Sequence, residues 1–149
     1  MNQPQIKIQT ADELYERTRN ERSNRDLFAV KEIDGRRVKR LHYLSVGEYQ
    51  RQTHFVLSLG TRIVAIASIQ PNPYEEGVIW MQQVSVEKKH QGKGFARMLL
   101  QAIHEYAAER DLMVSYSGFS EDGQRLKHIA LELNERYPRT ASPERLRDM

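Results

Sequence analysis

The hydrophobic pattern is clearest in the middle of the chain, where short apolar runs alternate with turn residues. His54–Leu59 and Arg62–Ile69 are rich in β-branched residues and flank the turn Gly60-Thr61, which predicts an antiparallel hairpin. The segment Pro71-Asn72-Pro73 should end the second strand, because proline supplies no backbone donor to a sheet. The next apolar run, Val78–Val86, predicts a third strand.

A helix and a further strand are predicted to follow that third strand. Apolar residues recur at helical spacing along one face, at Phe95, Met98, Leu99, Ala102, Ile103, Tyr106 and Ala107. Leu112–Ser117 then predicts another strand. Because a helix separates Val78–Val86 from Leu112–Ser117, the two strands should run parallel in a βαβ unit.

The N-terminal half is more polar, and its predicted elements are shorter. Gln5–Gln9 predicts a strand, and Thr10-Ala-Asp-Glu13 has the T-x-x-E spacing of a capping box that opens a helix. Ser45-Val-Gly-Glu48 is a second candidate capping box, beginning a short helix through Arg51.

Between these helices, Leu27–Ile33 and Arg36–Leu44 flank Asp34-Gly35, which predicts a hairpin. The run Arg36–Arg40 is strongly basic and could contact RNA or an acidic protein. Charge runs of this kind are more often a solvated face of a strand, and we favour that interpretation. Contact of this run with nucleic acid is kept as the alternative interpretation.

Near the C-terminus, Ser120–Gly123 predicts the start of a helix, with acidic residues at its positive end. Apolar residues keep helical spacing from Leu126 to Tyr137, and Pro138 should end the helix. We expect residues 138–149 to form a mobile polar tail. The order of strands followed by a βαβα unit predicts one domain over residues 1–149 with a mixed α/β sheet.

The amino-acid composition excludes several kinds of functional site. The 149 residues include no cysteine, so disulfides, thiolate metal sites and a cysteine nucleophile are excluded. The five histidines lack the spacing typical of metal ligands, and we expect no metal. No run of the chain has the apolar length of a membrane helix, and the first ten residues lack the apolar core of a signal peptide, so we expect a soluble, cytoplasmic protein. The net charge of +3 is compatible with an anionic ligand without requiring one.

The most informative segment is Gln91-Gly92-Lys93-Gly94-Phe95-Ala96, between the third strand and its helix. Two glycines allow a sharp reversal and a close approach of backbone N–H groups to a ligand. The first N–H groups of a helix lack intrahelical partners, so this turn is a candidate anion site. It matches neither the P-loop nor the dinucleotide fingerprint, because Gly94 is followed by Phe95 and the third residue after Gly94 is Arg97.

The spacing Gln91-x-x-Gly94-x-Ala96 resembles the coenzyme A signature of the GNAT acetyltransferase superfamily, [QR]-x-x-G-x-[GA]. The preceding V-x-V-E pattern from Val84 also resembles the strand that leads into that loop. The resemblance implies a GNAT-like fold with acetyl-CoA as cosubstrate. It further implies that Val84 and Val86 contact the pantetheine arm, while residues Gln91, Gly92, Lys93, Gly94, Phe95 and Ala96 contact the diphosphate. Lys88, Lys89 and His90 add positive charge beside this loop.

Amine acetylation needs a base for the amine proton and a donor for the leaving thiolate. Members of the resembled family often place a glutamate on the strand before the loop, where this chain has Val78. Glu76 is our first candidate for the base, since we expect it on the same side of the strand as Val78, and Glu75 is the second. Tyr116 is the candidate donor, with the hydroxyls of Ser117 and Ser120 as alternatives.

One departure from the family concerns the end of the chain. The family usually closes its sheet with two strands after the last helix, and this chain has too few residues left for them. The strand Leu112–Ser117 should therefore leave an open edge, which a homodimer, the N-terminal segment or the tail could cover. The function predicted is transfer of acetyl from acetyl-CoA directly to a primary amine of a small molecule, protein or aminoacyl-tRNA. The alternative is a non-catalytic acyl-CoA-binding module.

Overall fold

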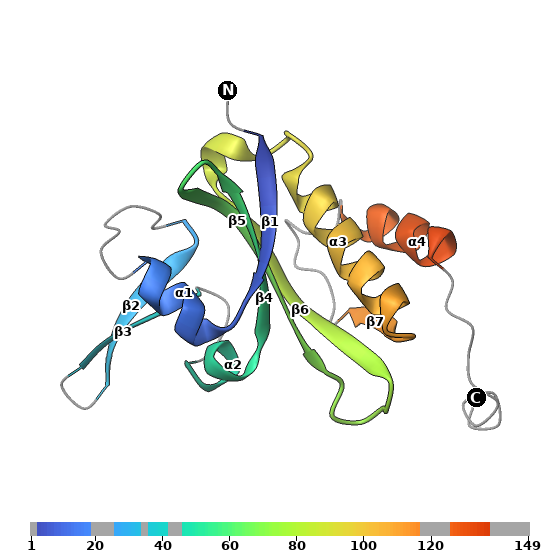
Figure 1. Ribbon diagram of the computed structural model, residues 1–149, viewed down its shortest axis with the longest axis horizontal. Coiled ribbons are helices and arrows are strands. Elements are labelled where there is room, and N and C mark those ends of the chain that lie inside the picture. The colour runs from blue at the N-terminus through green and yellow to red at the C-terminus, as the bar shows by residue number, and fades with distance from the viewer. Residues whose placement is uncertain (1–2, 19–25, 34–35, 42–45, 117–125, 138–149) are drawn as a thin grey trace.

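The computed structural model describes residues 3–18, 26–33, 36–41, 46–116 and 126–137. A five-stranded sheet with the order β1-β4-β5-β6-β7 runs through the middle of the molecule (Figure 1). Neighbouring strands are antiparallel except β6 and β7, which are parallel. The mixed sheet and the βαβ unit are therefore as predicted. The strands are β1 (Pro4–Gln9), β4 (Thr53–Leu59), β5 (Arg62–Pro71), β6 (Val78–Val86) and β7 (Met113–Tyr116).

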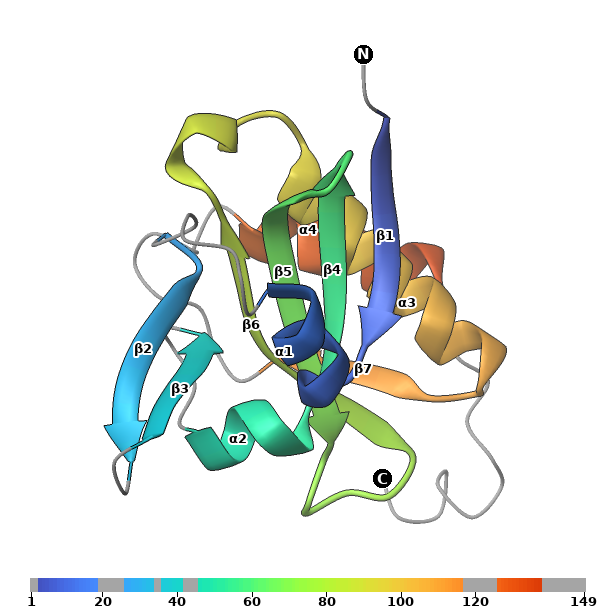
Figure 2. The same ribbon diagram turned by 60° about the vertical axis from the view of Figure 1, so that its left-hand side comes forward.

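Helices cover this sheet from both sides. Helices α3 (Phe95–Glu109) and α4 (Lys127–Arg136) pack together on one side (Figure 1). Helices α1 (Ala11–Thr18) and α2 (Val46–Arg51) lie on the other side. A separate hairpin of β2 (Phe28–Ile33) and β3 (Arg36–Leu41) flanks α1 and α2 (Figure 2). The predicted hairpin is confirmed over these residues, while its last predicted residues, 42–44, lie outside the described part.

The sheet has an apolar core on each face. On the side of α3, Phe55 from β4 and Ile79 from β6 pack against Leu99 and Ile103 of the helix, all of them buried. A smaller core on the other face joins α1 and β2 to β4 and β5, through Leu14, Phe28, Val56 and Ile66. The apolar face predicted for α3 thus covers the sheet, except for Met98, which is 37% exposed, and the buried Leu100 was not part of the prediction.

Local signals account for the ends of several elements. The capping box of α1 is formed in both directions: Glu13 N donates to Thr10 Oγ1 at 3.2 Å, and Thr10 N donates to Glu13 Oε1 at 3.1 Å. Strand β5 is longer than predicted, because its last residue, Pro71, still pairs with Ile79 of β6. Asn72 N then donates to Val78 O at 2.8 Å and closes the turn. The predicted helix start at 120–123 and the tail 138–149 lie outside the described residues.

None of the described helices is both long and apolar enough to cross a bilayer.

Candidate functional site

Strands β6 and β7 are paired over only part of their length. The parallel register runs from Val78 opposite Met113 to Met81 opposite Tyr116, and β6 then continues to Val86. Within the described ranges no strand pairs with β6 on the β7 side beyond Met81. On this side the backbone of residues 82–86 therefore has no strand partner among the described residues. We call this stretch the β6–β7 gap.

A β-bulge marks the point where the gap begins. Ser68 of β5 pairs with Gln83, and the next residue, Ile69, pairs with Met81, so Gln82 is an extra residue in β6. A bulge bends its strand and increases the local twist. The bulge thus coincides with the end of the β6–β7 pairing, and Val84 and Val86, which line the open part, pack their side chains against the α3-side core.

The glycine loop lies at the end of this open stretch. Gly92 and Gly94 have φ values of +81° and +84°, a region that other residues adopt only with strain. A Cβ added at either glycine would meet no atom within 4 Å, so the space in front of both is open. The short helix η1 (Lys88–His90) joins β6 to the loop, and the exposed Gln91 donates from Nε2 to Val86 O at 3.3 Å.

Helix α3 begins directly at the loop and has no side-chain cap. Gly94 is its N-cap, and the first intrahelical bond runs from Met98 N to Gly94 O at 3.1 Å. The N–H groups of Phe95, Ala96 and Arg97 consequently lack intrahelical partners. The buried ring of Phe95 fixes the start of the helix in the core. Unpaired donors at the positive end of the dipole are suited to an anion, and anion binding by this loop stays a prediction.

A buried carboxylate holds the connection between β6 and the loop. Glu87, which is 2% exposed, accepts hydrogen bonds from Arg62 of β5, at 3.3 Å from Nε and 2.5 Å from Nη2. Its backbone N donates to Val64 O at 2.9 Å. On the far side of the connection, Lys88 N donates to Asp26 Oδ2 at 3.0 Å. These contacts tie η1 to β5 and to the segment before β2.

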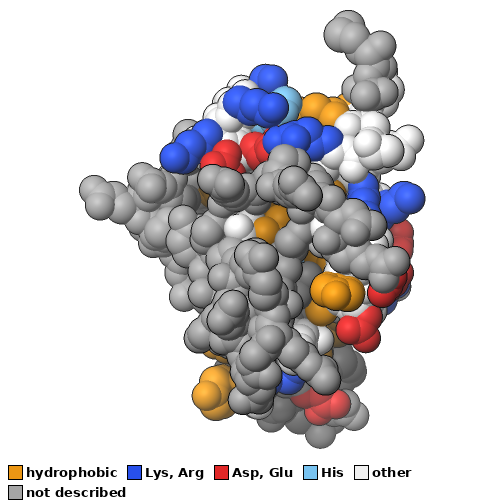
Figure 3. All heavy atoms as spheres, turned by 90° about the vertical axis from the view of Figure 1, so that its left-hand side faces the viewer, with side chains coloured by type: hydrophobic (Ala, Val, Ile, Leu, Met, Phe, Trp, Pro, Cys, Tyr) orange, Lys and Arg blue, Asp and Glu red, His pale blue; other side chains and the backbone are white. Residues whose placement is uncertain are grey.

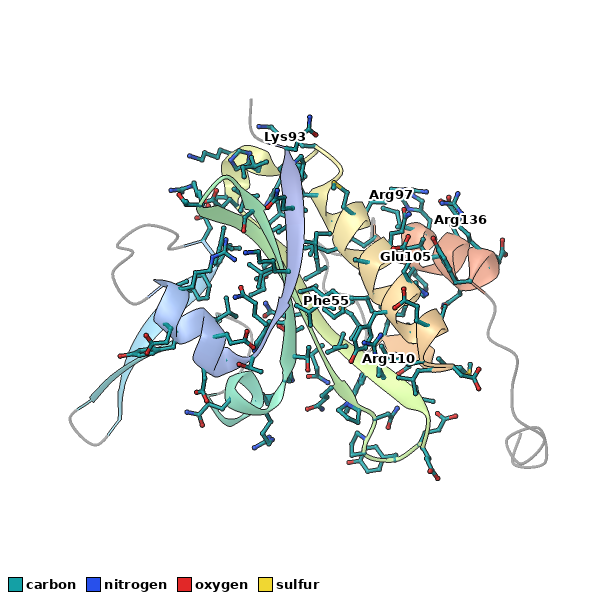
Figure 4. The ribbon with its side chains drawn as sticks, viewed as in Figure 1. Phe55, Lys93, Arg97, Glu105, Arg110 and Arg136 are labelled. Carbon is teal, nitrogen blue, oxygen red and sulfur yellow. The ribbon has the colours of Figure 1, made fainter. Side chains whose placement is uncertain are left out.

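The positive charge at this end comes mainly from lysine and arginine. Lys88 and Lys89 are exposed on η1, and Lys93 lies at the start of α3 (Figure 4). Figure 3 shows Lys and Arg side chains gathered around a histidine, with carboxylates beside them. Burial, and then the Lys93 ammonium, lower the pKa of His90, so His90 is neutral at pH 7. Lys93 Nζ donates to His90 Nδ1 at 3.1 Å, so His90 orients that lysine and contributes no charge of its own.

The candidate donor Tyr116 lies at the closed end of the gap. Its hydroxyl is 2.6 Å from Nε2 of His104, a buried residue of α3. Burial lowers the pKa of His104 to about 4 and raises the pKa of Tyr116 above its usual value, so both are neutral at pH 7. Tyr137, at the end of α4, donates to Glu105 Oε1 at 3.1 Å. The alternatives Ser117 and Ser120 lie outside the described residues.

The candidate base Glu76 is exposed in the turn before β6. The expectation that Glu76 continues the side of Val78 along the strand is wrong, because β6 begins only at Val78 and Glu76 lies in the turn before it. Glu75 is exposed in the same turn. Strand β6 has nine residues, so this turn lies about 30 Å from the glycine loop along the strand. In the described ranges no group of three His, Asp or Glu side chains is placed to hold a metal ion.

Three contributors to this site were not identified from the sequence: Arg62, His104 and the bulge at Gln82. Glu87 belonged to the V-x-V-E pattern, but its partner is 25 residues away on another strand, and no local spacing indicates that pair. His104 carried a weak signal, because it lies one position after Ile103 on the apolar face of α3. A bulge cannot be recognised from the alternation of apolar and polar residues before the strand pairing is known.

Comparison with known proteins agrees with this geometry. The sequence model of the acetyltransferase (GNAT) family matches residues 10–128. No curated protein matches the sequence. Among solved structures, a putative N-acetyltransferase from Lactobacillus plantarum is similar, with 19% identity, a TM-score of 0.56, and coverage of 86% of this chain and 83% of that one.

Two further similar structures contain ligands. Diaminobutyrate acetyltransferase from Paenibacillus lautus, solved with L-2,4-diaminobutyric acid and coenzyme A, is 16% identical, with a TM-score of 0.56 and coverage of 91% of this chain and 77% of that one. A putative streptothricin acetyltransferase from Bacillus anthracis, solved with acetyl coenzyme A, is 13% identical, with a TM-score of 0.56 and coverage of 87% and 82%. At this identity the likeness shows the fold, and the family model covers most of the chain. The chain therefore belongs to the acetyltransferase (GNAT) family.

Proposed function

We propose that this protein is an N-acetyltransferase that moves an acetyl group from acetyl-CoA directly to a primary amine. The observation that carries the proposal is the uncapped start of α3 at Gly94, directly after the stretch of β6 whose edge is open. The open edge would bind the pantetheine arm as an added strand, and the loop N–H groups would bind the diphosphate. The similar structures solved with coenzyme A or acetyl coenzyme A support this ligand.

In this proposal the protein supplies position and proton transfer. The neutral amine attacks the acetyl carbon, a C–N bond forms, the C–S bond breaks, and the sulfur leaves as a thiolate. Glu76 would receive the amine proton through a chain of waters, because its turn precedes β6 and the gap begins only after Met81. Tyr116 would donate a hydrogen bond to the thiolate from the closed end of the gap. No covalent enzyme intermediate is required, which agrees with a chain that contains no cysteine.

For Tyr116 to act in this way, its O–H hydrogen must be available. His104 is neutral, so one ring nitrogen carries a hydrogen and the other accepts. If Nε2 carries it, His104 donates to the tyrosine oxygen, and the O–H of Tyr116 can donate to the thiolate. If Nε2 accepts, the O–H is already used, and the protein resembles the alternative, a non-catalytic acyl-CoA-binding module. Val78 at the place of the family's glutamate also favours that alternative.

The absence of cysteine makes a direct test possible. A thiol reagent added to protein, acetyl-CoA and a panel of primary amines would report only the CoA released, since the chain has no thiol of its own. We expect release that depends on both protein and amine, with an acetylated amine detected by mass spectrometry. Binding of acetyl-CoA without amine-dependent release would contradict catalysis and support the binding module. If aminoacyl-tRNA is the acceptor, its binding should weaken steeply with added salt.

A further inference from the structure

The sheet face opposite α3 has a polar end. His54 of β4 lies opposite Ser68 of β5, and Ser68 lies opposite Gln83 of β6, so the three side chains form one row across three strands. The first two are fully buried and Gln83 is 7% exposed. The Nδ1 atom of His54 is 2.7 Å from Ser68 Oγ. Gln52, two residues before His54, is 3% exposed. We call these four residues the polar row.

The polar row contains side-chain atoms without hydrogen-bond partners. Oε1 of Gln83 has none, and neither Nε2 nor Oε1 of Gln52 has one. A buried polar atom without a partner is costly, and most such atoms in folded proteins bind another group, a water or a ligand. Gln83 lies on this face and Gln52 directly precedes β4 at the same end of the strand, whereas the other end of the face is apolar and packed by Val56, Ile63 and Ile66. The unmet hydrogen-bonding capacity is therefore concentrated in one place.

That place adjoins the proposed reaction site. Gln83 directly follows the bulge at Gln82, in the stretch of β6 that lines the gap. The opposite face of the sheet is closed by the packing of Phe95, Leu99 and Ile103 from α3. A second substrate that meets a thioester in the gap would thus approach from the face that carries the polar row.

We propose that the polar row binds the acceptor amine through a neutral hydrogen-bonding substituent, a hydroxyl or a carboxamide. This inference rests on the proposed function. None of the four residues carries a carboxylate, an ammonium or a guanidinium, so a charged substituent would be buried without a counter-ion. The two carboxamides offer both donors and acceptors, and a hydroxyl or carboxamide matches both. An apolar amine would leave them unpaired.

Three amines of equal chain length separate these possibilities: γ-aminobutyramide, n-butylamine and γ-aminobutyrate. With the wild-type protein we expect kcat/KM for the amide to exceed that for each of the other two by about tenfold or more, since unpaired buried polar groups penalise the analogues. The substitution Gln83→Leu should reduce the ratio of kcat/KM for the amide to kcat/KM for n-butylamine toward one, mainly by raising KM for the amide. Gln52→Leu should act in the same direction and serves as a second variant if Gln83→Leu does not fold.

Controls separate this inference from the proposed function. Gln101→Leu, on the exposed side of α3, should keep the wild-type ratio. Acetyl-CoA affinity, measured by calorimetry, should be unchanged in all three variants. A wild-type protein that binds acetyl-CoA yet uses none of the amines, prefers n-butylamine or γ-aminobutyrate, or keeps its preference in both glutamine variants would overturn the inference and leave cofactor binding intact. A wild-type protein that does not bind acetyl-CoA would instead refute the proposed function, and this inference with it.

Discussion

Burial changes the acid–base chemistry of His104. It is 3% exposed between α3 and β7, and burial lowers its pKa to about 4 from an ordinary value of 6.5. The folded protein therefore keeps this ring neutral where the unfolded chain would protonate it. Stability linked to His104 is fully present above pH 6.5 and is lost as the pH falls toward 4.

A pH series of urea unfolding experiments measures this linkage. Between pH 7.5 and pH 4, His104 should account for a decrease of roughly 2–3 kcal/mol in the free energy of unfolding. The variant His104→Gln keeps a side-chain amide near Tyr116 but cannot titrate, so its stability should fall less over the same range. Equal slopes in the two proteins would show that His104 is not held neutral by the fold.

Glu76 is the residue whose role depends most on the proposed chemistry. Glu76→Gln removes proton transfer without changing shape, so turnover at neutral pH should fall by about 10²–10⁴, with acetyl-CoA affinity unchanged. Glu75→Gln is the matched control, because it lies in the same exposed turn and should keep most of the activity. Wild-type turnover in Glu76→Gln, measured with any accepted amine, would remove Glu76 from the mechanism. A loss of turnover in Glu75→Gln alone would identify Glu75, and not Glu76, as the base.

Features that depend on neighbouring residues in the chain were predictable from the sequence, whereas contacts between distant segments were not. Gly94 before an apolar helix is a local signal, and the predicted loop and helix start are confirmed. The contact of His104 with Tyr116 depends on how α3 crosses β7, and the polar row depends on the register of three strands. Neither can be inferred from one chain segment, because residues on different strands meet only when pairing is known.

At the element scale, the connection η1 depends on the pair of Arg62 and Glu87. We expect Glu87→Gln to destabilise the protein by about 2 kcal/mol, as is typical for loss of hydrogen bonds to a charged group. Acetyl-CoA affinity should fall as well, because the lysines of η1 and the start of α3 lose their attachment to β5. Glu132→Gln is the comparison: it breaks the solvent-exposed pair with Arg97 and should change the unfolding midpoint little. Similar effects of the two substitutions would show that the buried pair has no special role.

The elements themselves were largely predictable, but their irregularities were not. Strand alternation and the intervening helix predicted β6 beside β7 in parallel, and the structure confirms this pairing. The β6–β7 gap begins where the described part of β7 ends, at Tyr116, and where β6 contains a bulge. A short apolar run indicates a strand without stating how much of it will pair, so the sequence alone could not locate the gap.

At the scale of the whole molecule, β7 is the edge of the sheet within the described residues. The N-terminal segment does not cover this edge, since β1 pairs with β4 at the opposite side. The exposed Met113 lies on β7, whereas Leu131, which is 58% exposed, lies on α4, which packs against α3. A strand edge without a described partner that also carries an exposed apolar side chain favours association with a second copy.

We therefore predict a homodimer formed across β7. Sedimentation at micromolar concentration should give twice the mass of the chain, and Met113→Lys, which places a charge on the edge strand, should shift the equilibrium toward monomer. Met98→Lys, on the exposed side of α3, is the control and should leave the mass unchanged. A monomer at all concentrations would contradict the prediction.

The central claim is that acetyl-CoA binds where the glycine loop opens α3, and calorimetric titration of Gly94→Val tests it most directly. A valine at φ +84° is strained, and its branches would occupy the open space in front of the helix N-terminus. Gly77→Val is the matched control, because Gly77 has φ +75° and lies in the turn before β6, at the far end of that strand from the loop. We predict that both variants fold and lose some stability, and that only Gly94→Val loses acetyl-CoA binding. Wild-type affinity in a folded Gly94→Val protein would contradict it.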